Sequence, residues 1–355
     1  MIRRRYLSRL FLGRVVAALL GLAGLLQLLD LLDNASDVLS RGGSGELWLY
    51  AARRLPSVLA QMMPLAVLIA AMLSLRRLAM TSEMAALRSA GVPVRSVLSA
   101  MLPVCLLAVL AQGVLSSVVA PRTERALAEW MARTDTRAIK PPSANPPRIW
   151  MRVGRDIVGI DRISPDGREL QGLLLVTRSP ERLILARTDA RRASRTTEGW
   201  VLHDVSVAAP GGETLRHLAE QPWPQGPAPA EIVEAARPTN AQTPGLLTRS
   251  LRGEQPAARG PAFFTTRLHE SAARLLSPLV MLLLAAPMAF ATPRRGAQML
   301  APLLCLALGL GFLLSGGLLG ALGEAAILPA PLAVWSVPVV FATIGAMLLM
   351  HYDER

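Results

Sequence analysis

Six stretches of the chain are almost entirely apolar, and each is long enough to cross a lipid bilayer as a helix. Such a helix needs roughly 20 mostly apolar residues with few charges among them. The stretches cover residues 10–29, 57–75, 97–120, 275–291, 299–322 and 330–350. The pattern predicts an α-helical membrane protein with six transmembrane helices, three on each side of a long polar interval.

The first of these helices is predicted to be retained in the mature protein. Arginines precede it, as in a secretory signal peptide, but no small-residue cleavage site follows it. The polar residues after it, from Asp30 onward to Arg54, are expected to form a loop on the far side of the membrane.

The arginines of the short loops predict the orientation, because short cytoplasmic loops carry the excess of positive charge. They gather before the first helix and in the loops that follow the second and fourth helices: Arg3, Arg4, Arg5, Arg9, Arg76, Arg77, Arg88, Arg95, Arg294 and Arg295. Both termini are therefore predicted to be cytoplasmic. The long interval between the third and fourth helices is predicted to lie on the outer side.

This interval, residues 121–262, is long enough to form a compact domain of its own. It contains short runs of alternating or β-branched residues separated by turn signals, and the expected strands cover 148–153, 156–160, 173–177, 183–186, 200–207 and 214–218. Such spacing favours an all-β sandwich or jelly roll. Trp150 and Trp200 are expected in its core, and residues 220–259, rich in Pro and Ala, are expected to return loosely to the membrane.

The predicted organisation is therefore residues 1–120 with helices 1–3, 121–262 with the β domain, and 263–355 with helices 4–6. A composition of 52% hydrophobic residues agrees with the membrane class. The formal net charge of +13 is partly explained by the loop arginines, so nucleic-acid binding is not predicted.

No cofactor or metal site is predicted. Cys105 and Cys305 lie in apolar stretches and are expected to be small core residues, and the four histidines lack metal-ligand spacing. A phosphate-binding P-loop needs Gly-Lys-Ser or Gly-Lys-Thr, whereas the single lysine, Lys140, stands between Ile139 and Pro141. ATP hydrolysis is therefore not expected in this chain.

The loop between the second and third helices predicts a short helix over residues 82–91. Thr81 or Ser82 can cap it, and Glu83 suits the positive end of the helix dipole. Gly91 suits the position after the last turn. Met84, Leu87 and Ala90 share one face. Either this helix rests on the membrane surface, or it is a coupling helix that docks on a cytoplasmic motor subunit.

The chain resembles the LptF/LptG family of lipopolysaccharide-export permeases, also called YjgP/YjgQ, over nearly its whole length. The matching features are Arg4 to Leu7, Leu55-Pro56 with Pro64, Ser82-Glu83-Met84 through Ala90-Gly91, Gly199-Trp200-x-Leu202, Leu275-x-x-Pro278-Leu279 and Pro293-Arg294-Arg295-Gly296. Between the two paralogues, residues 322–352 are more similar to LptG, while 293–296 are reminiscent of LptF.

The resemblance implies the membrane permease of an ABC-type exporter in the bacterial inner membrane, with a periplasmic jelly-roll-like domain. The expected partners are lipopolysaccharide, an LptB-like ATPase dimer, an LptF-like paralogous permease, a bitopic LptC-like protein and an LptA-like periplasmic bridge. Contact with the ATPase is expected from the short helix, through Ser82, Glu83, Met84, Leu87, Arg88 and Gly91.

The resemblance implies two further candidate sites. Basic residues past the first helix meet lipid phosphates in relatives; here Arg41, Arg53 and Arg54 are the nearest substitutes, with ordinary interfacial snorkelling as the alternative. Gly316 and Gly320 form a small-residue helix contact that is either static packing or part of a substrate gate.

Three alternatives remain open at the level of the sequence. The chain would also suit a permease for another envelope lipid or lipoprotein, or an envelope-assembly protein without a transport cycle. An intramembrane hydrolase is disfavoured because Ser277 and Ser315 have no evident neighbouring base.

Overall fold

A computed structural model describes residues 2–81, 83–89, 94–133, 148–154, 156–164, 166–179, 183–197, 199–209, 214–236, 245, 248–249, 251, 259–290 and 300–353. The chain divides into two compact units. The membrane unit comprises Met1–Leu127 and Thr266–Arg355, and the β unit comprises Ala128–Thr265.

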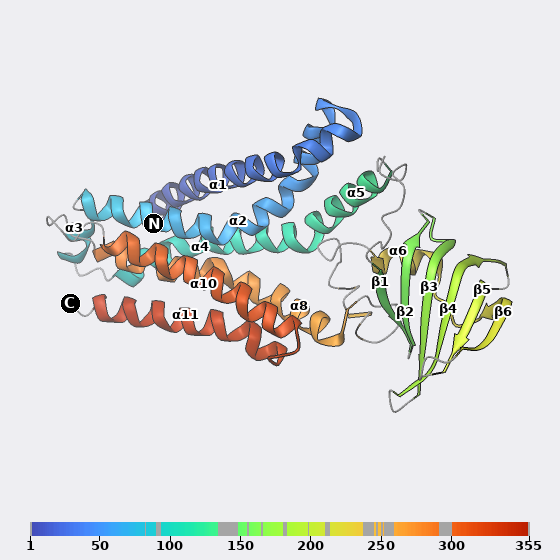
Figure 1. Cartoon of the computed structure of the whole chain (residues 1–355). Helices are drawn as coiled ribbons and strands as arrows, with labels where there is room; N and C mark the ends of the chain where they lie inside the picture. The colour runs from blue at the N-terminus through green and yellow to red at the C-terminus, as the bar shows by residue number, and fades with distance from the viewer. Residues whose placement is uncertain are drawn as a thin grey trace. The chain divides into compact units, whose positions relative to one another are not determined.

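The membrane unit is a bundle of long helices that run side by side (Figure 1). Its elements are α1 (Ile2–Gly42), α2 (Ser44–Met80), α3 (Glu83–Ser89), α4 (Val94–Val114), the π-helix η1 (Leu115–Val119), η4 (Arg274–Leu276), α9 (Ser277–Leu284), η5 (Ala286–Phe290), α10 (Leu300–Glu324) and α11 (Ala330–Asp353). Helices α5 (Ala120–Arg133) and α8 (Pro261–Ala273) begin or end in this unit and cross its boundaries. Within the described part of the chain, six helical segments are long and apolar enough to cross a membrane. The predicted six-helix arrangement is confirmed.

The helices differ from the prediction where charged residues begin. The expected loop over 30–54 is wrong, because α1 continues to Gly42 and α2 begins at Ser44. Gly43, with a φ of +91°, makes the turn between them. A hydropathy pattern ends where charges appear, whereas a helix continues as long as its backbone hydrogen bonds are made. The third span likewise continues past Ala120 through α5.

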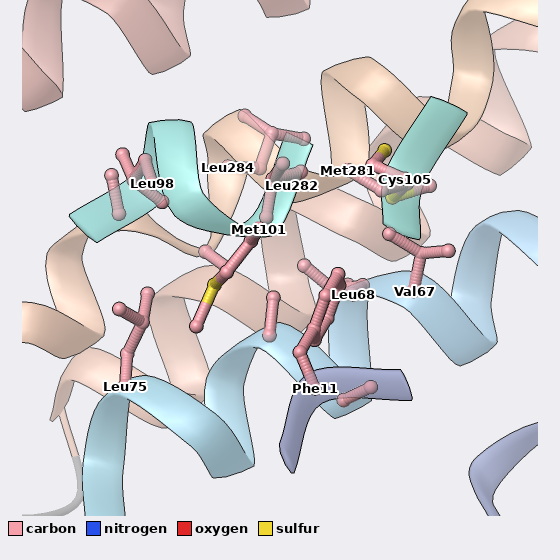
Figure 2. Close-up of a cluster of buried hydrophobic side chains, with 14 of the residues drawn as sticks. Phe11, Val67, Leu68, Leu75, Leu98, Met101, Cys105, Met281, Leu282 and Leu284 are labelled. Carbon is pink, nitrogen blue, oxygen red and sulfur yellow. The ribbon is translucent and has the colours of Figure 1, made fainter. Parts of the chain in front are cut away.

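Apolar side chains from α1, α2, α4 and α9 form the core of the membrane unit. Figure 2 shows Phe11 of α1, Leu68 of α2 and Met101 of α4 converging on one another, and each is fully buried. Cys105 and Cys305 are buried in the same cluster as free thiols, as the sequence predicts. Helices α1 and α10 leave rows of large apolar side chains exposed, as expected of faces that meet lipid or other membrane helices.

The β unit contains one antiparallel sheet in which each strand pairs with the next along the chain. Its strands are β1 (Ile149–Val153), β2 (Asp156–Ile163), β3 (Glu169–Arg178), β4 (Ile184–Arg195), β5 (Trp200–Ala208) and β6 (Thr214–Trp223). The predicted all-β domain between the third and fourth spans is confirmed. The described strands follow an up-and-down order, and the Greek-key crossings of a complete jelly roll do not occur among them.

Along one row of residues that crosses the strands, the alternation of buried and exposed side chains is interrupted. Buried residues lie two apart in a regular strand, but three apart across this row, as in the pairs Leu170/Leu173, Ala190/Ala193 and Leu202/Val205. Within the row, Gly172 and Asp204 have φ values of +65° and +54°. This local backbone change bends the sheet, so that the strand segments on both sides of the row face one apolar core.

Trp200 and Trp150 differ from each other in the folded chain. Trp200 is in the core as predicted: it is 1% exposed, and its Nε1 donates to the Pro227 carbonyl at 2.7 Å. The same expectation for Trp150 is wrong, because Met151 is the inward residue of β1 and Trp150 is 45% exposed. Arg148 lies over its ring and pairs with Asp161, and that hydrogen bond raises the pKa of the Arg148 guanidinium.

The beginning of the predicted loose return is structured. Strand β6 continues to Trp223, and α6 (Pro229–Ala236) follows it, with Ile232 buried in the sheet's core. Glu231 accepts a hydrogen bond from the Ala228 N–H at 3.0 Å, which stabilises the start of α6. Most of residues 237–258 lie outside the described residues.

Candidate functional site

The short helix α3 forms as predicted, over Glu83–Ser89. Ser82 and Gly91, expected at its two ends, lie outside the described residues, as do the side chains of Leu87 and Arg88. Glu83 and Met84 are therefore the predicted coupling residues whose side chains can be placed. The Glu83 side chain is exposed, whereas the Met84 side chain is buried.

Met84 packs α3 against the core of the membrane unit. Its side chain is 4% exposed and belongs to the same apolar cluster as Leu78 of α2 and Val97 of α4. The apolar face predicted for α3 is thus buried, at Met84, against the membrane unit of this same chain. The Thr81 hydroxyl, 2.9 Å from the Arg77 carbonyl and 3.1 Å from the Glu83 carboxylate, links the end of α2 to α3.

The opposite side of α3 is open. Glu83, Ala86 and Ser89 are all exposed and lie three residues apart, which places them on one face of the helix. Exposed arginines of the neighbouring helix ends, Arg77 and Arg95, add positive charge at this end of the membrane unit. Among the side chains of α3 that the structure describes, this open face carries one carboxylate, Glu83, at its start.

A polar cluster joins α1, α2 and α5 near the other ends of these helices. The Arg54 guanidinium donates to Glu124 Oε1 at 2.7 Å and lies 3.6 Å from Asp30 Oδ2. Ser57 donates to the same Glu124 oxygen at 2.6 Å, and Tyr50 donates to Asp30 Oδ2 at 2.9 Å. Glu124 is only 9% exposed, so this is a paired internal charge rather than a surface contact.

These contacts change the interpretation of the arginines predicted to bind lipid phosphate. Two carboxylates already offset the charge of Arg54, and Arg53 donates to the Ala126 carbonyl at 3.0 Å. Arg54 is therefore a poor candidate for a phosphate ligand, and both arginines contribute to packing between α2 and α5. The side chain of Arg41 lies outside the described residues.

Sequence reasoning did not single out Glu124 or place Gln27 inside the protein. Gln27, one turn before Asp30 on α1, is 9% exposed, and its amide atoms find no hydrogen-bond partner within the described ranges. Gln112 of α4 is in the same situation at 1% exposed. A polar residue within a span is the signal that could have marked both glutamines.

Gly316 and Gly320 do not pack against other helices of the described chain. No atom from elsewhere in the described residues lies within 4 Å of the position that a Cβ would take at either glycine. Gly309, on the same helix, is instead in close contact with Leu68 of α2. Within the part of the chain that the structure describes, the predicted glycine contact is thus not made.

The family model for the lipopolysaccharide export system permease LptF/LptG matches residues 5–351, which includes both units. The chain belongs to the LptF/LptG family. It is also similar to the lipopolysaccharide export system permease protein LptG of Haemophilus influenzae, with 23% identity over 253 residues that cover 68% of each chain. The resemblance inferred from the motifs is confirmed.

Membership of the LptF/LptG family indicates the functional class of the protein. Together with the six apolar helices, it makes the chain a multi-pass inner-membrane protein and a lipopolysaccharide-export permease, a transporter subunit rather than an enzyme.

Proposed function

We propose that this chain is the membrane-spanning subunit of an ABC-type exporter that extracts lipopolysaccharide from the inner membrane and passes it to a periplasmic bridge. The observation that carries the proposal is the LptF/LptG family match, which extends through both the membrane unit and the β unit. A lipid that leaves a bilayer needs an apolar route out of it, and the six helices and the apolar-cored β unit suit the two sides of such a route.

ATP hydrolysis is assigned to a separate LptB-like dimer that docks on α3. Met84 holds α3 against the apolar core, so a force applied to the open face of α3 reaches that core, to which α2 and α4 contribute side chains. Glu83 is the exposed charged group of that face and can pair with a basic residue of the ATPase. The α3 end is accordingly cytoplasmic, in agreement with Arg76, Arg77 and Arg95, which are exposed near it.

The remaining partners follow from the family. An LptF-like permease pairs with this chain, which is proposed as the LptG-like member on the similarity of residues 322–352. A bitopic LptC-like helix and an LptA-like periplasmic protein complete the route. Gly316 is exposed and Gly320 is half-buried, and the open space beside both glycines allows another membrane helix to approach α10 closely, which suits either a static interface or a gate.

The experiment that tests the proposal is purification of the tagged chain from its native membrane in mild detergent, with mass spectrometry of the bound proteins and lipids. We expect an ATPase, a second six-helix permease and lipopolysaccharide together. A different lipid bound with the same ATPase would instead favour export of another envelope lipid. No ATPase under conditions that keep other ABC exporters intact would contradict the transport function.

The coupling role of α3 is tested in proteoliposomes that contain the complete complex. Glu83→Lys is expected to lower ATP-dependent lipopolysaccharide release at least roughly tenfold, because it places a like charge against the basic partner. Glu83→Gln should retain more of the release, since it removes the charge without reversing it. The control is Glu169→Lys, which reverses an exposed carboxylate of the β unit. Equal release by Glu83→Lys and the unmodified chain would remove the coupling role from Glu83.

A further inference from the structure

Two helices carry the chain out of the membrane unit and back into it, and each bears a charged residue close to the boundary of that unit. Helix α5 leaves: the membrane unit ends at Leu127, three residues after Glu124. Helix α8 returns: the membrane unit resumes at Thr266, one residue before Arg267.

On the leaving side, helix α2 holds α5 through three polar contacts. Arg54 and Ser57 both donate to Glu124, at 2.7 and 2.6 Å, and Arg53 donates to the Ala126 carbonyl at 3.0 Å. Arg54 and Glu124 are 70 residues apart in sequence, so this contact joins two separate spans. Asp30 lies 3.6 Å from the other side of the Arg54 guanidinium.

On the returning side, helix α10 holds α8 in a similar way. Arg267 Nε lies 2.7 Å from Glu324 Oε1, at the last residue of α10. Gly323 allows this approach, because a Cβ there would lie 3.0 Å from the Thr266 side chain. Arg267 also pairs with Glu270 at 3.1 Å, and Glu270 pairs with Arg274 at 2.7 Å.

The burial of these ion pairs determines how strongly they stabilise the contacts of α5 and α8. The Glu124 side chain is 10% exposed and that of Glu324 is 22% exposed, so water screens both pairs less than it screens a surface pair. A charge at the end of an apolar span is costly without a partner. Loss of either glutamate would leave its arginine with another carboxylate, Asp30 for Arg54 and Glu270 for Arg267, neither of which joins the same two helices. The contact that holds α5 to α2, or α8 to α10, would be lost, and the connecting helix would then move away or unfold locally.

We propose that the pairs Arg54–Glu124 and Arg267–Glu324 are two clamps that fix the helices through which the membrane unit continues into the β unit. Their four residues are positioning residues. They keep the first turns of α5 and the last turns of α8 rigid, so that a movement of α2 or α10 is passed along the chain toward the β unit. The part of this inference that concerns transport rests on the proposed function; the rigidity of α5 and α8 does not.

The rigidity is tested by hydrogen exchange of the full chain in lipid nanodiscs. Glu124→Gln is expected to speed exchange at the α5 amides at least roughly tenfold, with exchange in α8 unchanged. Glu324→Gln is expected to speed exchange at the α8 amides to the same extent, with exchange in α5 unchanged. Asp189→Asn is the control, because it breaks an exposed pair with Arg187 inside the β unit. Unchanged exchange in α5 and α8 would overturn the proposal.

A double variant separates a clamp from a general packing defect. If Arg54 and Glu124 act through each other, Arg54→Gln with Glu124→Gln should accelerate α5 exchange no more than Glu124→Gln alone. Additive effects of the two substitutions would overturn the pairing.

The transport consequence is measured in proteoliposomes containing the complete complex. Either glutamate variant is expected to raise the ATP hydrolysed per lipopolysaccharide released at least roughly threefold, which is the signature of lost coupling. An unchanged ratio, alongside faster exchange in α5 or α8, would reject the transmission role and leave the clamps as local supports. If the unmodified complex releases no lipopolysaccharide, the proposed function fails, and the exchange data still decide the clamps.

Discussion

Removal of the Met84 side chain should release α3 from the core of the membrane unit and, as a result, weaken its contact with a partner. Met84 is 4% exposed, so truncation to alanine removes nearly all of its apolar contacts. Such truncations cost about 2–5 kcal/mol at buried positions. Helix α3 has seven residues, and an isolated helix shorter than about 12 residues is marginal in water, so most of this cost should appear as undocking of α3 alone.

The assay is hydrogen exchange at the α3 amides in lipid nanodiscs, combined with retention of the ATPase during purification. Met84→Ala is expected to remove most exchange protection in α3 and to weaken ATPase retention, while α4 keeps its protection. Met84→Leu, which conserves volume and costs less than about 1.5 kcal/mol, should restore both. If Met84→Ala leaves exchange in α3 unchanged, Met84 is not the anchor, and the burial argument fails.

Three further substitutions test the packing of the two units. Trp200→Ala should lower the opening free energy of β4 and β5 by about 3–5 kcal/mol in hydrogen exchange, against less than about 1 kcal/mol for the exposed Trp150→Ala; equal losses would contradict the assigned core. Gly172→Ala should destabilise the sheet by about 1–3 kcal/mol in the same measurement, because φ is +65° and a Cβ would meet Asp161; no loss would contradict the bend. Gly309→Leu should lower the melting temperature of the chain in detergent by overpacking against α2, whereas Gly316→Leu should not, and equal effects would contradict the open face of α10.

The sequence by itself determined the elements whose causes are local. A span is a matter of length and hydropathy, so all six were found, and the six strands followed from alternation and turn residues. The start of α3 could be predicted because a carboxylate, Glu83, suits the first turn of a helix. The family was recognisable because its motifs occur along the sequence in the family's order.

Only the tertiary structure decided which side chains meet. Glu124 and Arg54 stand 70 residues apart, and no local pattern indicates that packing of α5 against α2 would bring them to 2.7 Å. Arg54 was therefore interpreted as a group available to lipid, although two carboxylates already surround it. Met84 was placed correctly on an apolar face, but the sequence did not show that the core of the membrane unit covers it. Hydropathy is a property of each segment, whereas ion pairing and burial depend on the neighbours that packing supplies.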